Sequence, residues 1–231
     1  MEAILQKGLT ALNLPTENIP ALLTYASMLA EKNKVMNLTA ITDPANVARL
    51  HFLDSAALLT LADFHSKSVI DVGTGAGFPG LPLRILDPSI HLTLLDAQNK
   101  RIEFLREVCA ALNLEDISCI HARAEEHAAS HRAAYDIAVS RAVASLPVLA
   151  ELCLPLVKKG GLFLAMKSTD SGEEVKSAAR AVKLLGAEVQ NVLDYPIPGT
   201  EITHRLVILY KISATPEKYP RTFAKIKKNP L

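Results

Sequence analysis

The chain has 231 residues, of which 49% are hydrophobic and 21% charged, and its formal net charge is +1. This length suffices for one α/β domain with a sizeable core. The near-zero charge excludes a uniformly basic nucleic-acid binder, so any basic surface must be local. The sequence shows neither a signal-peptide pattern nor an apolar run of membrane-spanning length, and its three cysteines lack metal-ligand spacing. We therefore expect a cytoplasmic protein with reduced cysteines, no membrane contact and no metal.

Residues 1–66 show helical periodicity and no strand pattern, which predicts a helical extension packed on the rest of the chain. Asp43 followed by Pro44 is typical of a helix start, with Asp43 as the N-cap. His51 and Asp54 are lone polar residues on an amphipathic pattern, and this pattern alone favours the surface over a position in a cleft.

From Val69 the sequence alternates strand and helix patterns, which predicts a parallel sheet with helices on both faces over residues 67–213. The expected helices are Asn99–Leu112, Leu146–Val157 and Gly172–Leu185, the last with a capping box of Ser171 and Glu174. The expected strands are Val69–Val72, His91–Asp96, Ile117–His121, Tyr135–Ser140, Gly161–Lys167, Glu188–Leu193 and Arg205–Tyr210.

Only residues 194–204 separate the last two expected strands, too few for a crossover helix, so these strands should form a hairpin. The hairpin would add an antiparallel edge strand to the sheet. Residues 214–231 form a basic tail that prolines interrupt. The composition leaves two alternatives open for this tail, a solvated chain end or an arm that neutralises RNA phosphates.

A glycine loop follows the first expected strand, in the segment from Asp71 to Gly80. Glycine allows positive φ and a close approach of the backbone to a ligand, and the first amides of the following helix have no partner within that helix. Gly75-x-Gly77-x-x-Gly80 fits a dinucleotide fingerprint, although this pattern alone is weak.

Two carboxylates indicate which ligand the loop holds. Asp71 precedes the first glycine, where it would repel a pyrophosphate and attract a cationic ammonium group. Asp96 ends the second expected strand, about twenty residues after the loop, where ribose hydroxyls are bound. A ribose and an amino-acid moiety without phosphate describe S-adenosylmethionine, and they disfavour an NAD-linked dehydrogenase, for which no hydride-transfer His/Arg pair is evident.

The Asp-x-Gly-x-Gly-x-Gly motif resembles motif I of the class I S-adenosylmethionine-dependent methyltransferases. Further motifs narrow the resemblance to the small-subunit ribosomal RNA methyltransferase G family, also called glucose-inhibited division protein B. They are Asn33–Thr39, His51–Ser55, Pro79–Pro82, Leu94–Asp96, Lys100-Arg101, Phe104-Leu105, Arg123–Glu126, Ser140–Ala142 and Ala165–Lys167. The resemblance implies a Rossmann-like, mostly parallel seven-stranded sheet and methylation of guanosine N7 in 16S ribosomal RNA.

In open α/β sheets the ligand lies beyond the carboxyl ends of the strands, where the cofactor candidates fall. The resemblance implies cofactor contacts at five of these candidates: Gly73, Phe78, Ala124, Glu125 and Arg141. For Phe78 the alternative is a position in the hydrophobic core under the loop. The cofactor candidates are Asp71, Gly73, Gly75, Gly77, Phe78, Asp96, Ala124, Glu125 and Arg141.

The end of the fourth expected strand indicates the methyl acceptor. Ser140-Arg141-Ala142 lacks both the Asn/Asp-Pro-Pro signature of adenine-amino enzymes and the Pro-Cys nucleophile of cytosine-carbon enzymes. Guanine N7 has a free lone pair and needs no base, so catalysis reduces to positioning. Our catalytic candidates are Arg141, Arg123 and Glu125, with Glu125 or Asp54 offsetting developing positive charge. Either arginine has an ion pair with a cleft acid as its alternative role.

For RNA contacts we expect His51, Lys167, Arg205, Arg221 and Lys225. With net charge near zero, a folded 30S subunit or an assembly intermediate suits the chain better than naked RNA. We expect a monomer. The alternatives are a methyltransferase with a small-molecule or protein acceptor, and an RNA-binding module with a vestigial glycine loop.

Overall fold

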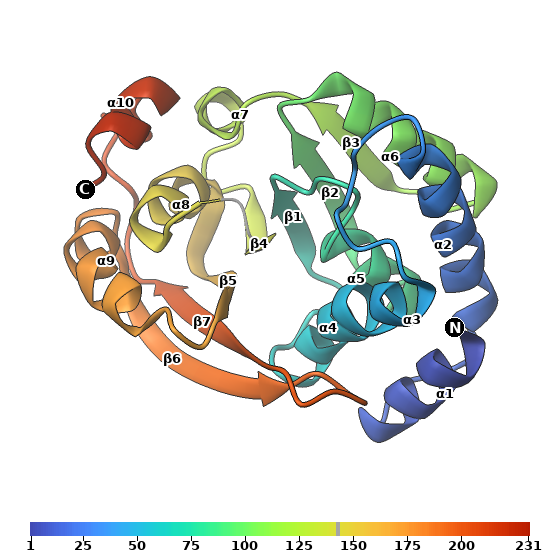
Figure 1. Cartoon of the computed structure of the whole chain (residues 1–231). Coiled ribbons are helices and arrows are strands. Elements are labelled where there is room, and N and C mark those ends of the chain that lie inside the picture. Colours follow the sequence, from blue (N-terminus) through green and yellow to red (C-terminus); the bar gives the residue numbers. More distant parts are fainter. Residues whose placement is uncertain (142–143) are drawn as a thin grey trace.

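The computed structural model describes residues 1–141 and 144–231. One sheet with the strand order β3-β2-β1-β4-β5-β7-β6 forms the centre of the molecule (Figure 1). Its strands are β1 Ser68–Val72, β2 His91–Asp96, β3 Ile117–His121, β4 Tyr135–Arg141, β5 Val157–Ser168, β6 Ala187–Pro196 and β7 Thr203–Lys211.

Strands β1 to β5 pair in parallel, whereas β7 is antiparallel to both β5 and β6. The predicted mostly parallel sheet and its terminal hairpin are therefore confirmed. The antiparallel strand β7 lies between β5 and β6, so that β6 occupies the edge. The order reverses at β1, with β2 on one side and β4 on the other, and a ligand crevice is expected at such a point.

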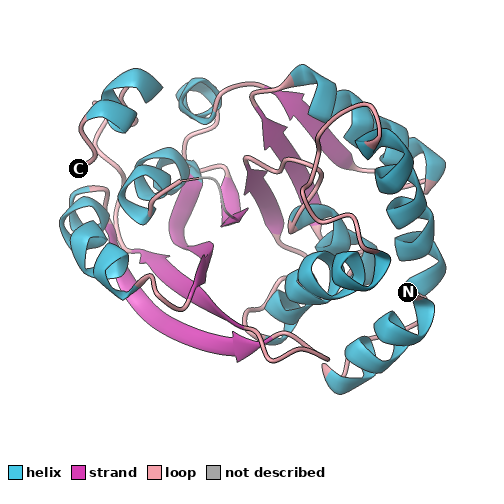
Figure 2. Cartoon of the chain, in the orientation of Figure 1, coloured by secondary structure: helices cyan, strands magenta, loops and turns pink. Residues whose placement is uncertain are grey.

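Helices cover both faces of the sheet (Figure 2). They are α1 Glu2–Ala11, α2 Ile19–Asn33, α3 Pro44–Val47, α4 Asp54–Ala57, α5 Gly80–Leu86, α6 Asn99–Ala111, α7 Ala124–Ser130, α8 Leu146–Cys153, α9 Gly172–Leu184 and α10 Phe223–Lys228. Alternate side chains of a strand join opposite cores: Val69 packs with the N-terminal helices, and Ile70 packs with α8 and α9.

The N-terminal extension shares the core of the sheet. Leu5, Leu22 and Phe52 belong to the same buried cluster as Val69 of β1. Asp43 is an N-cap as predicted, since its Oδ2 accepts a hydrogen bond from the Asn46 amide at 2.8 Å. A π-helical turn, η1 Ala48–Leu53, joins α3 to α4, and a 3-10 turn, η2 Leu58–Thr60, follows.

Two local expectations about helices were wrong. Ser171 makes no side-chain capping bond, because Glu174 is instead an ion-pair partner of Lys167 at 2.6 Å. The expected helix Leu146–Val157 ends at Cys153, and a 3-10 turn, η3 Leu154–Leu156, leads into β5. Helix α7 was not predicted.

The basic tail, residues 214–231, is not a solvated end. Tyr219 and Ile226 are buried in the core that α8 and α9 form with the sheet. Figure 1 shows α10 beside α8, which it contacts. None of the helices in the described part of the chain is long and apolar enough to cross a membrane.

Candidate functional site

The glycine loop follows β1 and is held by Asp71. Gly73, Gly75 and Gly77 have φ values of 73°, 60° and 107°, a region that residues with a Cβ rarely adopt. Asp71 Oδ2 accepts hydrogen bonds from Thr74 Oγ1 at 2.7 Å and from the Gly80 amide at 2.8 Å, which clasps the two ends of the loop together.

Asp71 is fully buried behind this loop, and its Oδ1 has no hydrogen-bond partner among the described residues. Burial raises the pKa of this carboxyl to about 6. The structure thus gives Asp71 a role in holding the loop, whereas the sequence predicted a direct ligand contact. Gly77 is also behind the loop, where a Cβ would collide with the Tyr25 hydroxyl.

Asp96 at the end of β2 supports the loop from the other side. Its Oδ2 accepts from the Gly75 amide at 2.9 Å, and its Oδ1 accepts from the Gln98 amide at 2.8 Å. Arg101 contacts the same carboxylate at 3.3 Å. The two oxygens of Asp96 therefore hold the backbone of the loop and the backbone after β2 together at the mouth of the loop.

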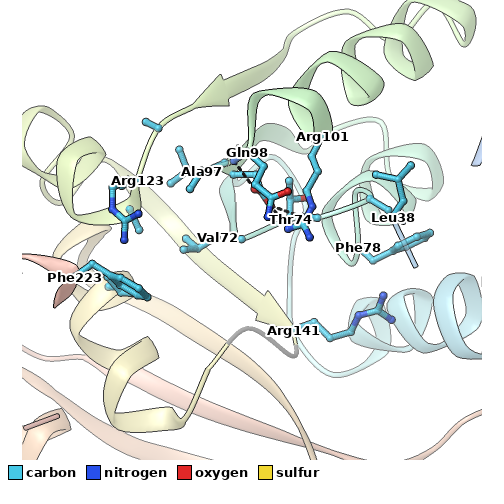
Figure 3. Close-up of a pocket in the computed structure, with 18 of the residues that line it drawn as sticks. Leu38, Val72, Thr74, Phe78, Ala97, Gln98, Arg101, Arg123, Arg141 and Phe223 are labelled. Carbon is cyan, nitrogen blue, oxygen red and sulfur yellow. Dashed lines mark hydrogen bonds and ion pairs between the residues drawn. The ribbon is translucent and has the colours of Figure 1, made fainter. Parts of the chain in front are cut away.

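A cavity of about 490 Å³ opens over the loop, and we call it the loop cavity. Figure 3 shows Arg123 and Phe223 on one side of it and Phe78 and Arg141 on the other. Its wall combines the N-terminal extension, the loop, the ends of β2, β3 and β4, and the C-terminal segment. Lining residues include Leu38, Thr39, His51, Gly73, Gly75, Phe78, Asp96, Gln98, Arg101, Arg123, Ala124, Glu125, Arg141 and Phe223.

Phe78 belongs to the hydrophobic core and also lines the loop cavity. The core position that was its alternative therefore does not exclude a position at the cavity. Its ring stacks on Tyr25 at 5.4 Å between centroids and on the His51 imidazole at 4.4 Å. The Arg141 guanidinium carbon lies 5.1 Å from the ring centroid. This stack fixes the end of the loop cavity nearest the N-terminal extension.

His51 is buried, so the expectation of a surface position was wrong. Its Nδ1 lies 3.0 Å from Arg141 Nη2, and because a guanidinium only donates, Nδ1 must accept. Its Nε2 then carries the proton and donates to Thr39 Oγ1 at 2.9 Å. Burial, followed by the Arg141 charge, lowers the pKa of His51 to about 4, so the ring is neutral at pH 7.

Asp54 is also buried, and it joins the N-terminal extension to the sheet. Its Oδ2 lies 3.1 Å from Arg141 Nη1, while its Oδ1 accepts from the Tyr195 hydroxyl and from His204 Nδ1, both at 2.9 Å. The sequence did not predict that Tyr195 and His204 take part. Burial and the Asp54 charge raise the pKa of the Tyr195 hydroxyl.

A second cavity of about 670 Å³ lies beside this cluster, and we call it the acceptor cavity. It shares only His51 and Arg141 with the described wall of the loop cavity. Its other lining residues include Asp54, Met166, Lys167, Glu174, Ile202 and His204. The two cavities therefore meet at a buried imidazole and a half-buried guanidinium. Ala142, quoted in the sequence motif with Arg141, lies outside the described residues.

Arg123 and Glu125 form the opposite end of the loop cavity. Arg123 Nε donates to Glu125 Oε1 at 2.7 Å, which is the ion-pair alternative that the sequence left open. Arg141 is paired as well, with Asp54 rather than Glu125. Figure 3 shows Arg123 across the loop cavity from Arg141, and Glu125 is bonded to Arg123, so the three catalytic candidates do not converge on one point.

Besides the buried His51, three of the expected RNA-contacting side chains are engaged within the chain. Lys167 binds Glu174 and the Ala144 carbonyl, both at 2.6 Å. Arg205 binds Asp194 through Nε at 2.6 Å and Nη2 at 2.8 Å. Arg221 pairs with the fully buried Glu151 at 2.6 Å. Lys225 lies on the exposed face of α10. In residues 1–141 and 144–231 no cluster of metal-ligating side chains is found.

Comparison with known proteins agrees with this architecture. The family model for rRNA small subunit methyltransferase G matches residues 18–202. The chain is similar to ribosomal RNA small subunit methyltransferase G of Clostridium botulinum (strain Loch Maree / Type A3), with 46% identity over 90% of this chain and 89% of the relative. The protein of the same name from Acetivibrio thermocellus is also 46% identical, over 95% of this chain and 91% of the relative.

Among solved structures, M. jannaschii TYW2 in complex with AdoMet superposes with a TM-score of 0.56 at 11% identity, covering 69% of this chain and 75% of that chain. Such a likeness concerns the fold, which is that of class I methyltransferases. The sequence relatives carry the more specific conclusion, because they span nearly the whole chain at almost half identity. The resemblance stated from the motifs is confirmed: the chain belongs to the rRNA small subunit methyltransferase G family.

Proposed function

We infer that this chain transfers a methyl group from S-adenosylmethionine to N7 of a guanosine in 16S ribosomal RNA. Family membership supports the reaction. The observation that supports separate sites for the methyl donor and the acceptor is that the two cavities adjoin at His51 and Arg141. Methyl transfer needs the donor and the acceptor in line and in contact, and two pockets with a shared wall provide that alignment.

The loop cavity fits the cofactor. Its volume is in the range of small-molecule sites, and its wall combines backbone of the glycine loop with the Asp96 carboxylate and apolar surface from Phe78 and Ala124. When bound, S-adenosylmethionine supplies an electrophilic methyl group on a sulfonium. We propose that Asp96 accepts hydrogen bonds from the ribose hydroxyls, and that Gly73, Gly75, Ala124 and Glu125 contact the ligand. Asp71 would act indirectly, by holding the two ends of the loop together.

The acceptor cavity is where we propose the guanine lies. Arg141 uses three N–H groups on described partners, namely Leu50 O, Asp54 Oδ2 and His51 Nδ1. A guanidinium has five, so donors remain for guanine O6. N7 is unprotonated at neutral pH, and no base is required. As the methyl transfers, positive charge develops on the purine, and the Asp54 carboxylate behind Arg141 offsets it.

The acceptor itself is part of a large particle, in our proposal. Lys167, Arg205 and Arg221 are bound to carboxylates, so three of the basic side chains expected to contact RNA are already paired within the chain. We propose that a monomer acts in the cytoplasm on the 30S subunit or on an assembly intermediate, which presents shape as well as charge.

Methylation assays on three acceptors test this function: assembled 30S particles, deproteinised 16S RNA and free guanosine. We expect 30S particles or their assembly intermediates to be methylated fastest, with the label on guanine N7 by nucleoside mass spectrometry. Equal turnover of free guanosine would indicate a small-molecule enzyme. A protein that binds no S-adenosylhomocysteine at millimolar concentration in calorimetry would instead be an RNA-binding module.

A further inference from the structure

The C-terminal segment, residues 214–231, is tied to the sheet domain by buried polar contacts. Arg132 donates to the Tyr219 carbonyl at 2.6 Å and to the Thr215 carbonyl at 2.7 Å. Arg221 donates from its backbone amide and its guanidinium to Glu151, a fully buried carboxylate on α8. These contacts hold the start of α10 in one place relative to the strands.

Phe223, the first residue of α10, is thereby brought to the wall of the loop cavity. Its backbone amide lies 3.3 Å from Glu125 Oε1, and the Arg123 guanidinium carbon lies 4.5 Å from the centre of its ring. Leu152 of α8 and Ala124 of α7 line the same end of the cavity. This end thus presents an aromatic ring and aliphatic surface, with Arg123 and Glu125 at its rim.

We propose that Phe223 is a cofactor-binding residue that forms a wall of the adenine subsite. This inference rests on the proposed function. The transferred methyl must face the acceptor cavity, which adjoins the loop cavity at His51 and Arg141. The adenine must then lie at the far end, where Phe223 and Arg123 are (Figure 3). The family model ends at residue 202, so it does not account for this residue.

The chemistry of that end suits a purine. A nucleobase has two apolar faces and a polar edge, and an aromatic ring offers it a stacking or edge contact. Arg123 and the Phe223 amide both donate to Oε1 of Glu125 and so hold its carboxylate in place. In our proposal the other oxygen, Oε2, accepts a hydrogen bond from an amino group on the base. The C-terminal segment therefore completes a subsite that β3 and α7 begin.

Calorimetry on the full chain tests the proposal with two ligands, S-adenosylhomocysteine and 5′-deoxy-5′-methylthioadenosine, which lacks the amino-acid moiety. Phe223→Ala should raise the Kd of both about tenfold, the loss of one aromatic contact. Phe223→Tyr should bind both as the original chain does. Lys228→Ala, an exposed change on the same helix, should have no effect.

A spectroscopic experiment reports contact directly, because the chain has no tryptophan. Phe223→Trp introduces a single tryptophan, whose emission should change on addition of S-adenosylhomocysteine. The matched control is Tyr210→Trp at a half-buried aromatic position on β7. Tyr210 pairs with Leu162 of β5, which pairs in turn with Ile137 in the first half of β4, away from the carboxyl ends where the loop cavity lies. Emission from that variant should not respond.

Three outcomes would overturn the proposal. The first is an unchanged Kd in Phe223→Ala. The second is a loss confined to S-adenosylhomocysteine while methylthioadenosine binds normally, which would place the ring at the amino-acid end. The third is emission from Phe223→Trp that does not respond to S-adenosylhomocysteine. If the original chain binds neither ligand, the proposed function fails instead.

Discussion

At the scale of single residues, the site depends on buried polar groups that hold one another. His51 accepts from Arg141 and donates to Thr39, and Arg141 in turn binds Asp54. The neutral imidazole adds no positive charge beside a purine that becomes cationic when it is methylated at N7. Removing Arg141 would leave the fully buried Asp54 without its guanidinium partner, and loss of such a partner costs several kcal/mol.

Arg141→Lys separates the function of Arg141 from its structural role. Lysine keeps a positive charge opposite Asp54, so we expect the fold to persist, but it loses the planar fork that positions guanine O6. Turnover on 30S particles should fall at least tenfold, with a smaller change in the Kd of S-adenosylhomocysteine. Arg180→Lys, on the exposed face of α9, serves as the control. Unchanged turnover in Arg141→Lys would remove Arg141 from the catalytic residues.

Asp71 should make stability depend on pH. Its pKa is raised from 3.8 to about 6 by burial, so the folded chain binds this proton more tightly than the unfolded chain. The stabilisation is complete below about pH 4 and is lost as pH rises through about 6. Asp71→Asn keeps an amide oxygen that can accept from Thr74 and Gly80 without this titration.

Urea unfolding from pH 4 to pH 7 measures the effect. The free energy of unfolding of Asp71→Asn, relative to the original chain, should rise over this range by on the order of 3 kcal/mol. Because the free energy of unfolding of the variant is compared with that of the original chain at each pH, the contributions of the other titrating groups cancel. Parallel pH profiles would mean that Asp71 has an ordinary pKa in the folded chain.

At the scale of elements, the carboxyl end of β2 determines the shape of the glycine loop. Asp96 accepts from two amides, one in the loop and one after β2. Asp96→Asn turns one acceptor into a donor that faces an N–H group. We expect the Kd of S-adenosylhomocysteine to rise at least tenfold and the free energy of unfolding to fall by about 1–3 kcal/mol.

Asp63→Asn is the matched control for that change, because Asp63 is exposed and accepts a single local amide bond, from His65. Calorimetry and urea unfolding on both variants give the two comparisons. If Asp96→Asn bound the ligand as tightly as Asp63→Asn does, the ribose assignment would be lost.

The C-terminal segment offers a second prediction at this scale. Arg221→Ala leaves the fully buried Glu151 without its guanidinium partner, and breaking such a pair costs about 3–5 kcal/mol in the free energy of unfolding. Lys176→Ala removes an ion pair of similar length, 2.7 Å to Glu173, from the surface, and should cost about 0–1 kcal/mol.

Urea unfolding of the two variants decides the comparison, and a double variant of Arg221→Ala with Glu151→Leu should recover most of the loss. Equal costs for the buried and the exposed pair would show that the segment is not anchored by Glu151.

At the scale of the whole molecule, features carried by neighbouring residues were predictable. The glycine loop, Asp96, and the Arg123–Glu125 pair depend on short-range patterns and on the rule that strand ends meet at one edge. The Asp54 cluster was not predictable, because Tyr195 and His204 are 141 and 150 residues away in sequence from Asp54. The ion pair between Arg221 and Glu151 was not predictable either, because the composition of a basic tail does not reveal that it has a buried carboxylate as its partner.

The wall of the loop cavity has a consequence for the order of events during synthesis. Its described lining begins at Leu38 and includes Phe223, so the wall is finished only after residue 223 has been synthesised and has left the ribosome. A nascent or prematurely terminated product could complete the sheet and still lack an adenine wall. Binding of the methyl donor would then report that translation has passed Phe223, and a product that stops earlier would be an incomplete enzyme even if its sheet had folded.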